Sequence, residues 1–82
     1  MSIPRYRQLA TNNEGFCFDP RTGETYQLNE SAQFILNALK EGRSQHEAAQ
    51  ALAETFLIPP SDALSDTEEF MQMLRIYGVL ES

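Results

Sequence analysis

Several residue types and segments on which many functions depend are scarce in this 82-residue sequence. It has one cysteine, Cys17, which excludes an internal disulfide, and one histidine, His46. A single thiol and a single imidazole do not make a typical zinc site, and they are far apart in the sequence for nucleophilic catalysis. The four glycines are scattered, so there is no phosphate-binding loop. These shortages predict a protein that is not an enzyme and holds no metal or cofactor.

Long apolar runs are also missing. No segment approaches the length that spans a bilayer, and the first residues lack the apolar stretch of a signal peptide. We therefore expect a cytoplasmic protein with no membrane partner. The free cysteine fits a reducing compartment.

Basic residues are scarce in the second half of the chain. Residues 1–43 carry five basic and five acidic groups, whereas residues 44–82 carry one basic and seven acidic groups, so the net charge of −6 arises there. A field of this sign repels phosphate backbones and favours neutral or basic partners. Nucleic acid is therefore not an expected partner.

What is present begins with strand and turn signals. Clusters of turn-forming residues at 11–15 and 19–23 separate three segments that favour short strands, namely residues 5–9, 16–18 and 25–28. The expected product is a three-stranded antiparallel meander. The side chains predicted for its buried face are Phe16, Phe18, Tyr26 and Leu28.

From Asn29 onwards the apolar residues recur at helical spacing. Asn29 is a good N-cap, and Gly42 ends the first predicted helix. Ser44 and Glu47 form a capping box for a second helix, which Pro59-Pro60 is expected to end. A third helix is predicted from Ser61 or Asp62 to Gly78. The predicted core residues are Ala32, Ile35, Leu36 and Leu39, then Ala49, Leu52, Ala53 and Phe56, then Ala63, Thr67, Phe70, Leu74 and Tyr77, with Val79 and Leu80 folding back onto the core.

The sequence thus predicts one α+β domain over residues 1–82. It is winged helix-turn-helix-like, with a three-stranded antiparallel sheet followed by three helices.

Two stretches carry a resemblance to a known family. Residues 28–42, with Leu28-Asn29-Glu30-Ser31-Ala32 at their start, and the closing run from Asp66 to Leu80 resemble the PqqD family, and the similarity extends over residues 15–81. The resemblance implies a peptide-binding adaptor that recognises the leader segment of a ribosomally made precursor peptide. It also implies that the leader binds as an extra strand on the third strand, in a cleft walled by the third helix. The implied partners are the precursor peptide and a modifying enzyme such as a radical SAM enzyme, a cyclase or a leader peptidase.

The charges on the two edge strands support the same mode of binding. The predicted first strand carries Arg5 and Arg7 next to Pro4, and such residues protect a sheet edge against pairing. The third strand carries no charge, which favours addition of a peptide there. The predicted peptide-binding residues on this strand are Thr25, Tyr26, Gln27 and Leu28. The alternative is that so short a strand needs no protection.

The third helix carries apolar residues beyond its core stripe, namely Leu64, Met71, Met73 and Ile76. Methionine suits a surface that adapts to a ligand. Asp66, Glu68 and Glu69 are candidates for selecting basic residues in a leader, and Arg75 for an acidic one. The residues predicted to bind peptide on this helix are Leu64, Thr67, Glu68, Met71 and Arg75. The alternatives are a wider core face and ordinary solvated charge.

Two other functions remain open from the sequence. One is a structural subunit that docks a protein loop in the same cleft of an enzyme complex. The other is a DNA-binding winged helix, which the acidic third helix disfavours, since base recognition relies on Arg, Lys, Asn and Gln.

Overall fold

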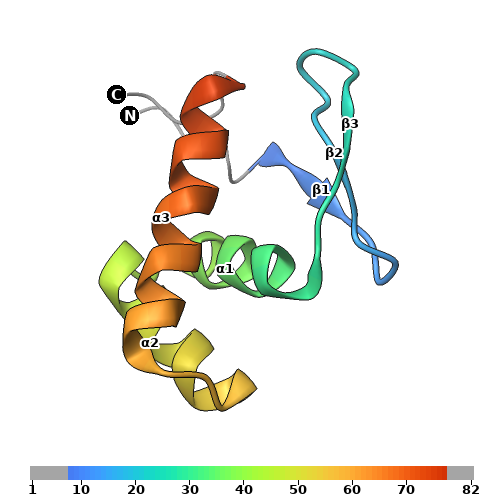
Figure 1. Ribbon diagram of the computed structural model, residues 1–82. Coiled ribbons are helices and arrows are strands. Elements are labelled where there is room, and N and C mark those ends of the chain that lie inside the picture. The colour runs from blue at the N-terminus through green and yellow to red at the C-terminus, as the bar shows by residue number, and fades with distance from the viewer. Residues whose placement is uncertain (1–7, 78–82) are drawn as a thin grey trace.

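The computed structural model describes residues 8–77, and its elements follow one another in the predicted order (Figure 1). The strands are β1 (Ala10–Thr11), β2 (Phe16–Phe18) and β3 (Thr25–Gln27). The helices are α1 (Glu30–Lys40), α2 (Gln45–Phe56) and α3 (Pro60–Ile76). The strands pair antiparallel in the order β1-β2-β3. The predicted α+β architecture, with three strands before three helices, is confirmed.

The starts of α1 and α2 follow from local hydrogen bonding. The Asn29 side chain accepts a hydrogen bond of 2.8 Å from the backbone N–H of Ala32. Ser44 and Glu47 form the predicted capping box, in which each side chain accepts from the backbone N–H of the other residue. Each cap satisfies donors that the first helical turn leaves without a partner. Both helix starts were therefore predictable from a few neighbouring residues.

The predicted first strand is wrong in the part that the structure describes. Leu9 precedes the sheet, β1 is Ala10–Thr11, and residues 5–7 lie outside the described range. The cause is the register, which places Ala10 opposite Phe18. The next pair would place Leu9 opposite Asp19, where the chain leaves β2 and turns, with the Gly23 N–H donating to the Asp19 carbonyl at 2.8 Å. An earlier β1 would have no strand to pair with.

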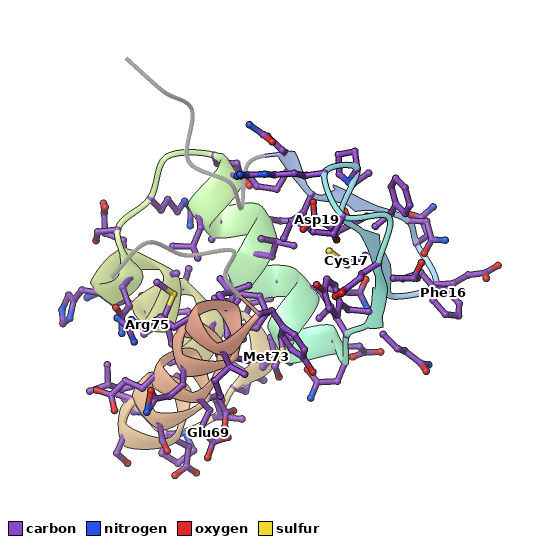
Figure 2. All side chains as sticks on the ribbon, turned by 90° about the horizontal axis from the view of Figure 1, so that it is seen from above. Phe16, Cys17, Asp19, Glu69, Met73 and Arg75 are labelled. Atoms are coloured by element: carbon purple, nitrogen blue, oxygen red, sulfur yellow. The ribbon has the colours of Figure 1, made fainter. Side chains whose placement is uncertain are left out.

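The predicted buried face of the sheet is half wrong. Phe16 and Phe18 are 43% and 45% exposed, whereas Cys17 between them is 1% exposed. Figure 2 shows Cys17 pointing toward α1 and Phe16 pointing away from the helices. The register pairs Cys17 with Tyr26, so these two share the helix-facing side, and Leu28 is buried as predicted. The two larger phenylalanine side chains therefore lie on the outer face.

The connection between α2 and α3 also differs from the prediction. The helix α2 ends at Phe56, before Pro59-Pro60, because Leu57 adopts the left-handed conformation with φ 54°. The Ile58 N–H then donates to the Ala53 carbonyl at 3.2 Å, which completes a Schellman-type ending. Pro60 is the first residue of α3, where its missing N–H costs nothing. Gly78, Val79 and Leu80 lie outside the described residues.

The core is built around α1, which Figure 1 shows between the sheet and α2. The residues Ile35 and Leu36 of α1 have no exposed surface. The other buried apolar side chains around them include Cys17, Leu28, Leu39, Leu52, Ala63, Phe70 and Leu74. Tyr77, predicted for the core, is 48% exposed. Tyr77, the residue after α3, contacts Tyr26 of β3.

Candidate functional site

The outer edge of β3 has no strand beside it within residues 8–77, because β3 pairs with β2 alone. The Leu28 N–H donates to the Gly15 carbonyl at 2.7 Å, and the Asp19 N–H donates to the Glu24 carbonyl at 2.9 Å. Antiparallel pairs alternate between hydrogen-bonded and non-hydrogen-bonded, so Thr25 and Gln27, opposite Phe18 and Phe16, form non-hydrogen-bonded pairs. Their backbone N–H and C=O groups point away from β2. The open edge therefore offers two residues with free backbone groups.

The junction between β3 and α1 is held closely. Gly15 has φ +93°, and a Cβ atom there would lie 2.6 Å from the Leu28 carbonyl oxygen and 2.9 Å from the Gln33 side-chain nitrogen. Only glycine permits this approach. The same nitrogen donates to the Leu28 carbonyl at 3.3 Å. These contacts fix the direction in which β3 leads into α1.

A hollow of about 320 Å³ lies between α1 and α3, just beyond the end of β3. Its lining combines apolar, carboxylate and small polar side chains. The lining residues are Asn29, Ser31, Ala32, Ile35, Asp66, Glu69, Phe70 and Met73. Figure 2 shows Met73 on the side of α3 that faces the sheet, with Arg75 on the opposite side. We refer to this space as the α1–α3 hollow.

An aromatic pair connects β3 with the residue that follows α3. The Tyr26 and Tyr77 rings are 4.7 Å apart between centroids and tilted by 46°. The Tyr26 hydroxyl donates to a Glu24 carboxylate oxygen at 2.7 Å. This hydrogen bond, with a smaller contribution from burial, raises the pKa of Tyr26 to about 12. The pair joins β3 to the C-terminal end of α3.

The comparisons with known proteins agree with this geometry. Residues 14–80 match the family model described as coenzyme PQQ synthesis protein D (PqqD). The chain belongs to the PqqD family. A solved structure described as lasso peptide synthetase B1 complexed with the leader peptide is similar to it, with a TM-score of 0.76 and 29% sequence identity. The alignment covers 90% of this chain and 88% of that one. No curated protein matches the sequence significantly.

In this PqqD family member, the residues predicted to bind peptide fall into separate groups. Thr25, Tyr26 and Gln27 form β3, and Leu28 follows it with its side chain buried. Thr67 is fully buried, and its hydroxyl donates to the Ala63 carbonyl at 2.8 Å, so it lies in the core and not at the surface. The strand residues are therefore the part of the prediction that lies beside the α1–α3 hollow.

The other predicted helix residues lie on the far side of α3. Leu64 lines a hollow of about 460 Å³ with residues of α2, among them His46 and Ala49. Glu68, Met71 and Arg75 line another hollow, together with Gln45 and with Glu69, which also borders the α1–α3 hollow. Whether any of them contacts a peptide stays a prediction. Their position separates them from the edge of β3.

Residues that line the α1–α3 hollow were missed as a group. The sequence singled out Asp66, Glu69 and Met73 as individual residues on the third helix, but it did not link them to Asn29 or Ala32. The core stripe of α3 has two flanks, and the seven-residue spacing of Leu64 and Met71 favoured the flank on which Leu64 faces α2. The contact between Tyr77 and Tyr26 identifies the flank that faces β3, and it requires the fold.

The described residues offer little for catalysis. Burial raises the pKa of the Cys17 thiol, which disfavours the nucleophilic thiolate. Within residues 8–77, no three His, Cys, Asp or Glu side chains are grouped to hold a metal ion. In the same part of the chain, no helix is long and apolar enough to cross a membrane. The arrangement is suited to holding an extended ligand.

Proposed function

We propose that this PqqD family member is an adaptor that captures the leader segment of a ribosomally synthesised precursor peptide and presents it to a modifying enzyme. The observation that carries the proposal is the open edge of β3 beside α3, in a chain that is similar to a protein complexed with a leader peptide. The leader would add as a fourth strand next to β3. The chain itself would perform no chemistry on the peptide.

Strand addition would use both parts of the site, the open edge of β3 and the α1–α3 hollow. The backbone groups of Thr25 and Gln27 supply hydrogen bonds that do not depend on the sequence of the ligand. Alternate side chains of an added strand point to the same side as Tyr26, toward α3 and the α1–α3 hollow. Backbone pairing therefore supplies affinity, and the hollow supplies selectivity.

The partner enzyme belongs to the same proposal. A radical SAM enzyme, a cyclase and a leader peptidase all act on precursor peptides that a leader-binding adaptor can deliver. The acidic second half of the chain argues against a nucleic-acid partner, because Arg75 is its single basic residue and a phosphate backbone would be repelled. The proposal therefore assigns two partners, a peptide and an enzyme, and no nucleic acid.

The test substitutes one residue of the open edge. Gln27→Pro removes the backbone N–H of a non-hydrogen-bonded pair, so the bonds between β3 and β2 remain. We expect the affinity for a leader peptide, measured by isothermal titration calorimetry, to fall by about five- to tenfold, because one backbone hydrogen bond to the ligand is lost. The matched control Gln27→Ala keeps the N–H and should bind as the native chain does.

Two results would contradict the proposal. Gln27→Pro that stays folded and binds a leader with native affinity would exclude strand addition at β3. If no leader from a broad panel binds the native chain, the function as a docking subunit for a protein loop becomes the better explanation.

A further inference from the structure

The α1–α3 hollow has two chemically different parts. Ala32 and Ile35 of α1 and Phe70 and Met73 of α3 provide apolar surface. Asp66 and Glu69 line the same hollow from α3 and bring two carboxylates to it. A ligand that fills the hollow therefore meets apolar surface and negative charge together.

In the part of the chain that the structure describes, no basic side chain pairs with either carboxylate. Within residues 8–77, neither the Asp66 nor the Glu69 carboxylate has a hydrogen-bond or ion-pair partner. Arg75, the single basic residue after residue 43, lies on the side of α3 opposite Met73 (Figure 2) and shares the lining of a second hollow with Glu69, but it forms no ion pair with it. The carboxylates are thus available to a positively charged ligand.

We propose that the site selects leader peptides in which an apolar side chain and a lysine or arginine lie two positions apart. The apolar side chain enters the α1–α3 hollow, and the basic side chain pairs with Asp66 and Glu69. This inference rests on the proposed function and adds the chemistry of the preferred ligand.

The spacing follows from the geometry of a strand beside a helix. In an added strand, side chains on one face recur every second residue, about 6.5 Å apart. Asp66 and Glu69 are three residues apart on α3, about 4.5 Å along its axis. An apolar residue in the hollow therefore brings the next residue on the same face within reach of either carboxylate, because lysine and arginine have long, flexible side chains.

Selection from a library tests this preference without a known ligand. Random twelve-residue peptides, displayed on the mRNA that encodes them, are selected on the immobilised full chain. We expect the recovered peptides to be enriched in an apolar residue with Lys or Arg two positions away. Selection on the double variant Asp66→Asn/Glu69→Gln should recover the apolar residue without the basic one.

A double-mutant cycle measures the charge pairing directly. The cycle uses one selected peptide and its Lys→Gln form. Compared with the native chain, the double variant should bind the lysine peptide about fivefold more weakly and the glutamine peptide with the same affinity. The lysine peptide should also bind more weakly in 0.5 M than in about 0.05 M salt. The matched control is Glu68→Gln, which removes a carboxylate from the far side of α3 and should change neither affinity.

The outcomes separate this inference from the proposed function. If selected peptides bind through β3, so that Gln27→Pro weakens their binding, but show no basic preference, the inference is wrong and the function stands. A drop in melting temperature of the double variant with an unchanged peptide preference would show that the carboxylates act on stability alone, which also overturns the inference. If no peptide is enriched, both fail.

Discussion

Cys17 is the single thiol of the chain, and it lies on the helix-facing side of the sheet with 1% of its surface exposed. Burial raises its pKa, and Lys40 offsets this only in part. We predict that a thiol-reactive disulfide reagent at pH 8 labels the folded chain very slowly, because both access and the thiolate fraction are low. The chain unfolded in urea should react at once. Fast labelling of the folded chain would contradict the assigned face of β2.

Tyr26 gives a prediction for alkaline pH. Its pKa is raised to about 12, so the folded chain favours the protonated phenol relative to the unfolded chain, in which the pKa is about 10. The resulting stabilisation is complete below pH 10 and is lost as the pH rises toward 12. Absorbance at 295 nm should show a tyrosine that ionises near pH 12, and Tyr26→Phe should lack it.

The control for this titration is Glu24→Ala. It removes the carboxylate that accepts the Tyr26 hydrogen bond, so the pKa of Tyr26 should return toward its ordinary value. A component near pH 12 that persists in Tyr26→Phe would assign the raised pKa to another tyrosine.

At the residue scale, the prediction from the sequence failed where it assigned the face with the two aromatic side chains of the second strand to the core. Phe16 and Phe18 are larger than Cys17 and were predicted to be buried, yet the pairing of Cys17 with Tyr26 determines which side faces α1. A shift of one residue in a strand reverses every side chain. The short β2 has too few residues for its own pattern to determine the face.

At the element scale, the end of α2 provides a stability prediction. Leu57 has φ 54°, a conformation that costs a non-glycine residue about 1–2 kcal/mol, and 89% of its surface is exposed. Leu57→Gly should therefore raise the free energy of unfolding in urea by about 0.5–1 kcal/mol, after the greater chain entropy of glycine is deducted. Leu57→Ala keeps the strained φ and should change stability by less than about 0.5 kcal/mol. A destabilised glycine variant would reveal a packing role for Leu57.

Elements with local causes were predicted well. Asn29 and the Ser44–Glu47 capping box determine where α1 and α2 begin, and their hydrogen bonds are made within four residues. The strand β1 depends instead on a partner, since its register with β2 decides which residues pair. The site has the same dependence: which flank of α3 meets β3 is decided by tertiary packing, visible in the contact between Tyr26 and Tyr77.

At the scale of the whole molecule, the charge distribution and the fold point to the same ligand. The excess acidity of residues 44–82 includes Asp66 and Glu69, which line the α1–α3 hollow beside an uncharged sheet edge. Under the proposed function, a positively charged segment would be steered toward that side and held by the open backbone groups of β3. The edge strand and the sign of the charge were both predicted from the sequence, and their role in binding stays a prediction. The hollow was not predicted, because it forms only when α1 and α3 pack together.

The most direct test of leader binding at β3 is an amide NMR titration of the isotope-labelled full chain with leader peptides from the same organism. We predict chemical-shift changes at Thr25–Gln27, at Asn29 and Ala32, and at Asp66, Glu69 and Met73, with micromolar affinity or better. The residues of the hollow of about 460 Å³ between α2 and α3, such as Ala49 and Leu64, should stay unchanged. Changes confined to that hollow, or no changes with any leader, would contradict the account.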